Sequence, residues 1–167
     1  MKLTSRTNTL LALVLTALTA CGGGSVDPAT ATKEGQKALA SGDSALAAKN
    51  FNEALLAIGG DTKNPSFTQA KLGLVKALVG VEPARAVSEV EALVASHPDL
   101  MDDKALYDIA DRLRKAGKYS ESTALLKLGT DKFPDSKALD TLGKALADDQ
   151  ANMPPEVLAE LAGLGYL

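Results

Sequence analysis

Few side chains in this sequence have the types and the spacing that chemistry needs. The one cysteine, Cys21, and the one histidine, His97, lie far apart, so a zinc site would have to be built largely from carboxylates. Asp99, Asp102 and Asp103 form an acidic cluster that lacks the alternating oxygen ligands and the glycine of a calcium loop. We interpret these acids as N-cap and first-turn residues of a helix, and His97 as a helix-end residue. The sequence therefore predicts no metal site.

The sequence patterns of catalysis and phosphate binding are also missing. Two glycine-rich stretches, at residues 22–24 and 59–60, are not followed by Lys-Ser or Lys-Thr at the spacing of a phosphate-binding loop. No serine lies in a nucleophile elbow, and the thiol of Cys21 lies beside a processing signal. We therefore expect no catalytic residue, no cofactor and no enzymatic activity, which leaves binding as the function to look for.

The composition favours a helical protein without a nucleic-acid partner. Of the 167 residues, 46% are hydrophobic and 23% are charged, which is typical of a folded globular protein. Alanine and leucine dominate and aromatic residues make up only 4%, a balance that suits the packing of helix on helix. The formal net charge is −3 and the basic residues form no stripe, so a nucleic-acid footprint is disfavoured.

The first 20 residues have the three parts of a secretory signal. Lys2 and Arg6 precede an apolar run at residues 10–18, and small residues follow it. The run is shorter than the roughly 20 apolar residues that a spanning helix needs. Residues 18–21, Leu-Thr-Ala-Cys, resemble a bacterial lipobox. This resemblance implies that the signal is cut before Cys21 and that Cys21 carries acyl chains such as palmitate.

The residues from Cys21 onward predict an anchored tether. Residues 21–32 open with glycines and a serine after the cysteine, and a flexible stretch of this kind would lift the next domain off the bilayer. More than one acyl chain at Cys21 gives stable anchoring. Gly22 stands where an aspartate tends to retain enterobacterial lipoproteins at the inner membrane, so the resemblance favours the outer membrane of a bacterial cell envelope, facing the periplasm. The alternative is an ordinary signal peptide with a stray cysteine beside its cleavage site.

Residues 33–167 are expected to form one helical domain of repeated hairpins. In the first unit the apolar spacing predicts helices over residues 31–40 and 44–58, and Gly59-Gly60 ends the second of them. Asp135 or Ser136 can cap a helix near the end of the chain. The units span about residues 28–61, 64–98 and 102–134, followed by a partial repeat or cap at 136–167.

The spacing of small and bulky residues within these units resembles a tetratricopeptide repeat. The first unit carries the pattern in Gly35, Gly42, Ala47, Phe51 and Ala54, and similar spacing returns in the next two units at a period near 34. The resemblance implies an all-α fold of stacked antiparallel helical hairpins in a right-handed superhelix, with about three repeats and a C-terminal capping region. An ordinary helical bundle is the alternative, although a bundle has no need to keep this period.

In this family, ligands commonly meet the face formed by the first helix of each hairpin. By repeat position this face would hold Thr32, Gln36 and Leu39, then Ala70, Leu74 and Ala77, then Tyr107, Asp111 and Arg114. The partner-binding candidates among these are Gln36, Leu39, Leu74, Tyr107, Asp111 and Arg114. An apolar middle and a polar third unit suit an extended peptide or a partner helix with a charged end.

The residues with which chaperone-binding members of the family clamp a C-terminal carboxylate are not reproduced here. Thr32 and Gln36 replace the first lysine and asparagine, and Asp108 stands where an arginine belongs. Binding of chaperone tails is therefore disfavoured.

Two functions remain after these exclusions. The first is a lipid-anchored adaptor or scaffold that holds another envelope protein or peptide at the membrane surface. The second is a structural or quality-control lipoprotein of the envelope that acts by self-association through its hairpin ends.

Overall fold

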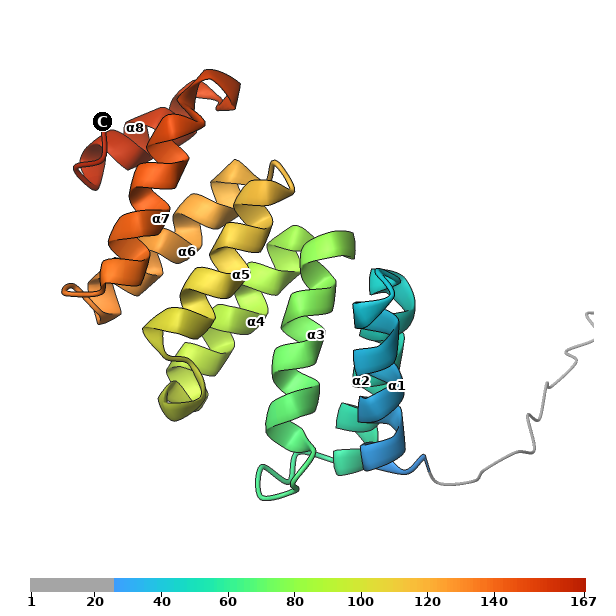
Figure 1. The fold of residues 1–167 in the computed structure, drawn as a ribbon. Helices are drawn as coiled ribbons and strands as arrows, with labels where there is room; N and C mark the ends of the chain where they lie inside the picture. The colour runs from blue at the N-terminus through green and yellow to red at the C-terminus, as the bar shows by residue number, and fades with distance from the viewer. Residues whose placement is uncertain (1–25) are drawn as a thin grey trace, which may run out of the picture.

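The computed structural model describes residues 26–167, and all the regular secondary structure in this part of the chain is helical (Figure 1). It holds eight α-helices and two short 3₁₀ helices, and no strand occurs between residues 26 and 167. The prediction of an all-α fold is confirmed. The predicted signal peptide, Cys21 and the first part of the tether lie outside the described residues. The α-helices are α1 (Pro28–Ala40), α2 (Ser44–Ile58), α3 (Phe67–Val81), α4 (Pro83–Ser96), α5 (Asp103–Lys115), α6 (Tyr119–Lys132), α7 (Lys137–Asp148) and α8 (Pro155–Gly163).

Side-chain caps decide where several helices begin. Asp27 accepts a hydrogen bond from the Thr30 amide at 2.9 Å, and Pro28 occupies the first helical turn, where its missing N–H costs nothing. As a result α1 begins at Pro28, and residues 28–32, which the sequence assigned to the tether, belong to the helix. Of the candidates that the sequence offered, Asp102 caps α5 and Ser136 caps α7.

The helices form successive antiparallel pairs whose first members lie in a row. Helix α1 contacts α3, α3 contacts α5, and α5 contacts α7, while α4 contacts α6 and α6 contacts α8. Figure 1 shows α3, α5 and α7 side by side in front of α4 and α6. One continuous cluster of buried apolar side chains runs through this arrangement from α1 to α8.

Glycines at the contact points let neighbouring helices approach closely. The Phe51 ring on α2 is wholly buried between Gly35 of α1 and Gly73 of α3, and a Cβ atom built at Gly35 would lie only 2.8 Å from that ring. At the other end of the chain, the Tyr166 ring covers Gly143 of α7 in a comparable way. The contact of small and large residues that the sequence indicated for the first unit is therefore present.

Candidate functional site

Two neighbouring hollows lie along the row formed by α1, α3 and α5. The first has a volume of about 300 Å³ and the second about 390 Å³. Leu39 and Lys76 line both hollows, so we treat them as one groove, the α1/α3/α5 groove. The first hollow is lined by Gln36, Leu39, Phe51, Gln69, Leu72, Gly73 and Lys76, and the second by Leu39, Gly42, Ser44, Lys76, Val79, Gly80, Arg112, Lys115 and Ala116.

The first hollow combines an apolar floor with amide side chains. Because Gly73 has no side chain, the Phe51 ring packs directly beneath the hollow between α1 and α3, where it is wholly buried. Leu39 and Leu72 are half-buried on either side, while Gln36 and Gln69 are exposed. An apolar floor beside amide donors and acceptors can hold an apolar side chain and hydrogen-bond the main chain that carries it.

The second hollow is lined by three cationic side chains from two helices. Lys76 Nζ lies 2.7 Å from Asp108 Oδ2, Arg112 Nε lies 3.0 Å from Asp108 Oδ1, and Lys115 Nζ lies 2.6 Å from Asp111 Oδ2. Partial burial acts to raise the pKa of Asp108, but the hydrogen bonds and charges of Lys76 and Arg112 outweigh it and hold that pKa below its ordinary value. Asp108 therefore stays ionised and fixes two of the three cations.

The sequence-predicted binding residues divide into two groups in the structure. Gln36 and Leu39 line the groove. Leu74, by contrast, is only 2% exposed and packs in the core, as do its neighbours Ala70 and Ala77. The side chain of Leu74 therefore packs in the interior of the protein and does not line the groove.

Asp111 and Arg114 hold two helices together. Asp111 is 8% exposed, and its carboxylate lies 3.0 Å from the Arg114 guanidinium. Arg114 Nη1 also donates to Asp149 Oδ2, just after α7, at 2.7 Å. Tyr107 is half-buried and packs against the core from the same helix. The charged pair predicted for partner binding thus joins the C-terminal end of α5 to that of α7.

Sequence reasoning missed most of the residues that line the groove. Gln69, Leu72 and Lys76 are three and four residues apart, so they share one face of α3 and could have been found as a polar-apolar stripe. The repeat pattern instead pointed to Leu74, which is two residues from both Leu72 and Lys76, lies on the opposite side of α3 and faces the interior. Arg112 and Lys115 on α5 share the same three-residue spacing.

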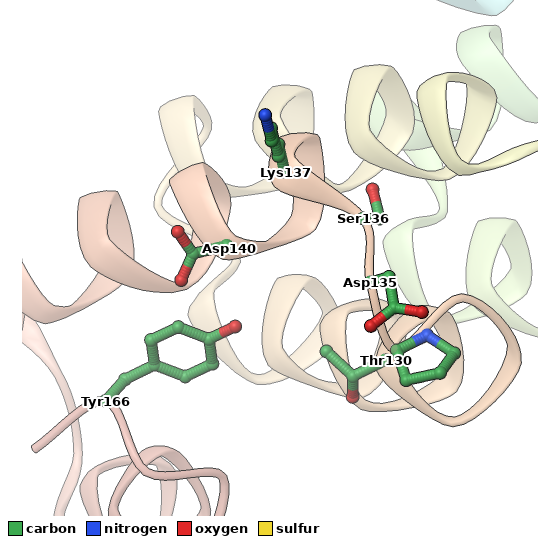
Figure 2. Close-up of a pocket in the computed structure, with 7 residues that line it drawn as sticks. Thr130, Asp135, Ser136, Lys137, Asp140 and Tyr166 are labelled. Carbon is green, nitrogen blue, oxygen red and sulfur yellow. The ribbon is translucent and has the colours of Figure 1, made fainter.

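Two further hollows lie elsewhere on the described residues. One, of about 290 Å³, lies beside the start of α7; Figure 2 shows the Tyr166 ring near Asp140 and Asp135, with Lys137 pointing away from them. Burial, and to a lesser extent the charge of Asp140, raise the pKa of Tyr166 above its ordinary value, so its hydroxyl keeps its proton. The other hollow, of about 330 Å³, lies over α4, α6 and α8.

The part of the chain that the structure describes contains neither a cluster of three or more metal-ligating side chains nor a membrane-spanning helix. Between residues 26 and 167, no cluster of three or more His, Cys, Asp or Glu side chains is arranged to hold a metal ion. In the same range, every helix is too short or too polar to cross a bilayer.

Comparison of the chain with protein-family models, with curated proteins and with solved structures finds no match. The site must therefore be interpreted from its own residues.

Proposed function

We propose that this protein is a lipid-anchored adaptor of the bacterial cell envelope that binds a segment of another envelope protein in the α1/α3/α5 groove. In this proposal the chain is tetratricopeptide-like, with its successive helical hairpins stacked into a right-handed superhelix. It acts by binding, without catalysis or a cofactor. Acylated Cys21 would anchor it at the outer membrane, with the helical domain facing the periplasm.

The observation that carries the binding half of the proposal is the groove itself. It runs over three helices that are far apart in sequence, and it offers an apolar floor, two exposed glutamines and a cationic end. The row of first helices, with Phe51 seated between Gly35 and Gly73, is the arrangement that stacked hairpins produce. These features support recognition of an extended segment of a protein partner.

The membrane half of the proposal rests on the lipobox-like residues 18–21. Mass spectrometry of the mature N-terminus should detect an acylated Cys21, and Cys21→Ser should move the protein from the membrane fraction to the soluble fraction. An unmodified thiol at Cys21 in the mature protein would contradict this half.

The binding half can be tested by site-specific photo-crosslinking in intact cells. A photo-reactive phenylalanine derivative placed at Gln36 or at Gln69 should crosslink to the same envelope protein, because both positions are exposed in the groove. Lys127 on α6, which lies on a different row of helices, is the control position and should give no such product. Equal crosslinking from all three positions would contradict groove binding.

A further inference from the structure

The second hollow of the groove presents positive charge without the matching negative charge. Lys76, Arg112 and Lys115 line it, whereas Asp108 and Asp111, which pair with them, are not among its lining residues. Asp108 serves two of these cations at once, since it accepts from both Lys76 and Arg112. Three cations are thus held by two carboxylates, and the surplus charge faces the hollow.

The cations keep unused hydrogen-bond donors. A guanidinium carries five N–H donors, and among the described residues only Nε of Arg112 is engaged by a side chain, in its bond to Asp108. The side chain of Arg112 is 49% exposed and that of Lys115 is 67% exposed, so both can reach a ligand. A carboxylate that enters the hollow would find charge-assisted donors that are already positioned.

The surroundings of the groove favour a protein segment over a lipid headgroup. Residues 26–167 carry 16 basic and 21 acidic side chains, a balance of −5, so the domain as a whole is repelled by an anionic membrane surface. Next to the cations, Leu39 and Leu72 offer partly exposed apolar surface to an apolar side chain, and Gln36 and Gln69 can bond a peptide main chain.

We infer that the groove selects an acidic, extended peptide segment, with an apolar side chain in the α1/α3 hollow and a nearby carboxylate against Lys76, Arg112 and Lys115. The inference rests on the proposed function, because it takes the groove as the site of partner binding. It adds that the ligand is negatively charged, and that its carboxylate lies near an apolar side chain along the peptide.

The inference can be tested with a phage-displayed library of random peptides selected against the full chain in detergent. The enriched sequences should place Asp or Glu within a few residues of Leu, Ile, Phe or Met. A synthetic peptide of the enriched sequence should bind the double variant Arg112→Gln, Lys115→Gln about tenfold more weakly than the unchanged protein. Its affinity for the unchanged protein should also fall as salt rises from about 0.05 M to about 0.3 M.

The matched control is the double variant Lys127→Gln, Lys132→Gln, which removes the same charge from exposed positions on α6. It should bind the peptide as well as the unchanged protein does. Equal weakening in both double variants would show a general charge effect and overturn the inference. Displacement of the peptide by a soluble short-chain phosphatidylglycerol would overturn it in favour of a lipid headgroup.

A third variant separates failure of this inference from failure of the proposed function. Leu72→Gln alters the apolar hollow and leaves the cations in place. If the enriched peptides carry no acidic residue yet lose binding with Leu72→Gln, the groove binds a partner and the inferred acidity is wrong. If neither Leu72→Gln nor the Arg112, Lys115 double variant weakens any enriched peptide, both the inference and groove binding fail.

Discussion

At the scale of single residues, the contact between Phe51 and Gly73 has the sharpest consequences. The ring is wholly buried, and a Cβ atom at Gly73 would collide with it, while Gly35 closes its other side at 2.8 Å. The ring has no free direction in which to move. This contact sets the distance between α1 and α3, and therefore the depth of the groove's apolar hollow.

Gly73→Ala should lower the free energy of unfolding by up to about 2 kcal/mol. Alanine gains about 1 kcal/mol of helix propensity over glycine, but forcing a methyl group against a buried ring costs about 1–3 kcal/mol. Urea or thermal unfolding measures the difference. Gly163→Ala is the control, because a Cβ atom at Gly163 meets nothing within 4 Å, and its stability should be unchanged or slightly raised. Equal stability of the two variants would mean that Phe51 is not confined as described.

At the scale of elements, polar contacts hold α5 and α7 together at both ends. Ser136, the cap of α7, donates to Asp103 Oδ2 at 2.6 Å, and at the opposite end Arg114 bridges Asp111 and Asp149. Lys76 and Asp108 form the one described ion pair between α3 and α5, at 2.7 Å. The contacts between neighbouring helices of this row therefore differ. The contact between α1 and α3 is apolar, whereas the contacts of α5 with α3 and with α7 include charged side chains.

Ser136→Ala should lower the free energy of unfolding by about 1 kcal/mol, since it removes both the cap of α7 and the bond to Asp103. Chemical denaturation checks this value. The control is Ser120→Ala in the exposed first turn of α6, which should change stability by less than about 0.5 kcal/mol. A loss no larger than that of the control would show that the start of α7 is held by packing alone.

The Asp111 network should make stability depend on acid pH. Burial acts to raise the pKa of Asp111, but hydrogen bonds from Lys115 and Arg114 outweigh it, and the folded pKa is lowered. As the pH falls, the Asp111 carboxylate therefore takes up a proton earlier in the unfolded chain than in the folded protein. The stabilisation is fully present above the pKa that Asp111 has in the unfolded chain, and it is lost as the pH falls through the pKa that Asp111 has in the folded protein. The stability difference between the unchanged protein and Asp111→Asn should therefore shrink between about pH 5 and about pH 2. A difference that stays constant over this range would contradict the network.

At the scale of the whole molecule, the two ends of the row of helices decide between an adaptor and a self-associating protein. The outward positions of α1 are polar, with Lys33, Glu34 and Lys37 exposed, and α7 exposes Asp140 and Lys144. The large apolar side chains exposed at these ends, Leu46 and Leu56 on α2 and Leu167 at the C-terminus, are few.

The acyl-free protein, made without residues 1–20 and with Cys21→Ser, should therefore be a monomer. Sedimentation equilibrium measures its mass directly, and a monomer leaves the groove open for a different partner. A stable oligomer would instead favour the structural or quality-control function that acts through the hairpin ends. Charge reversal of Lys33 and Lys37 would then test whether α1 forms the contact.

The sequence by itself determined that this chain is helical and where α2 begins and ends. Small and apolar residues at helical spacing predicted α2 over the same residues that the structure shows, and the αL glycine that ends it was visible as Gly59-Gly60. These features are local, because a cap or a helix stop depends on neighbours within one turn. The start of α1 was placed later than Pro28 because Asp27, its cap, lies in a stretch that looks like a linker.

Only the tertiary structure decided which side chains line the groove. A shift of one or two residues turns a side chain by 100° or 200° round its helix, so Leu74 enters the core while Leu72 and Lys76 face the hollow. Likewise, Arg114 became a link between α5 and α7 because Asp149, 35 residues away, lies beside it in the fold. The spacing of residues within one helix shows which of them share a face. Which way that face points depends on how the helix is rotated against its neighbours, and this rotation is set by contacts between residues far apart in sequence. The groove could therefore not be derived from the sequence alone.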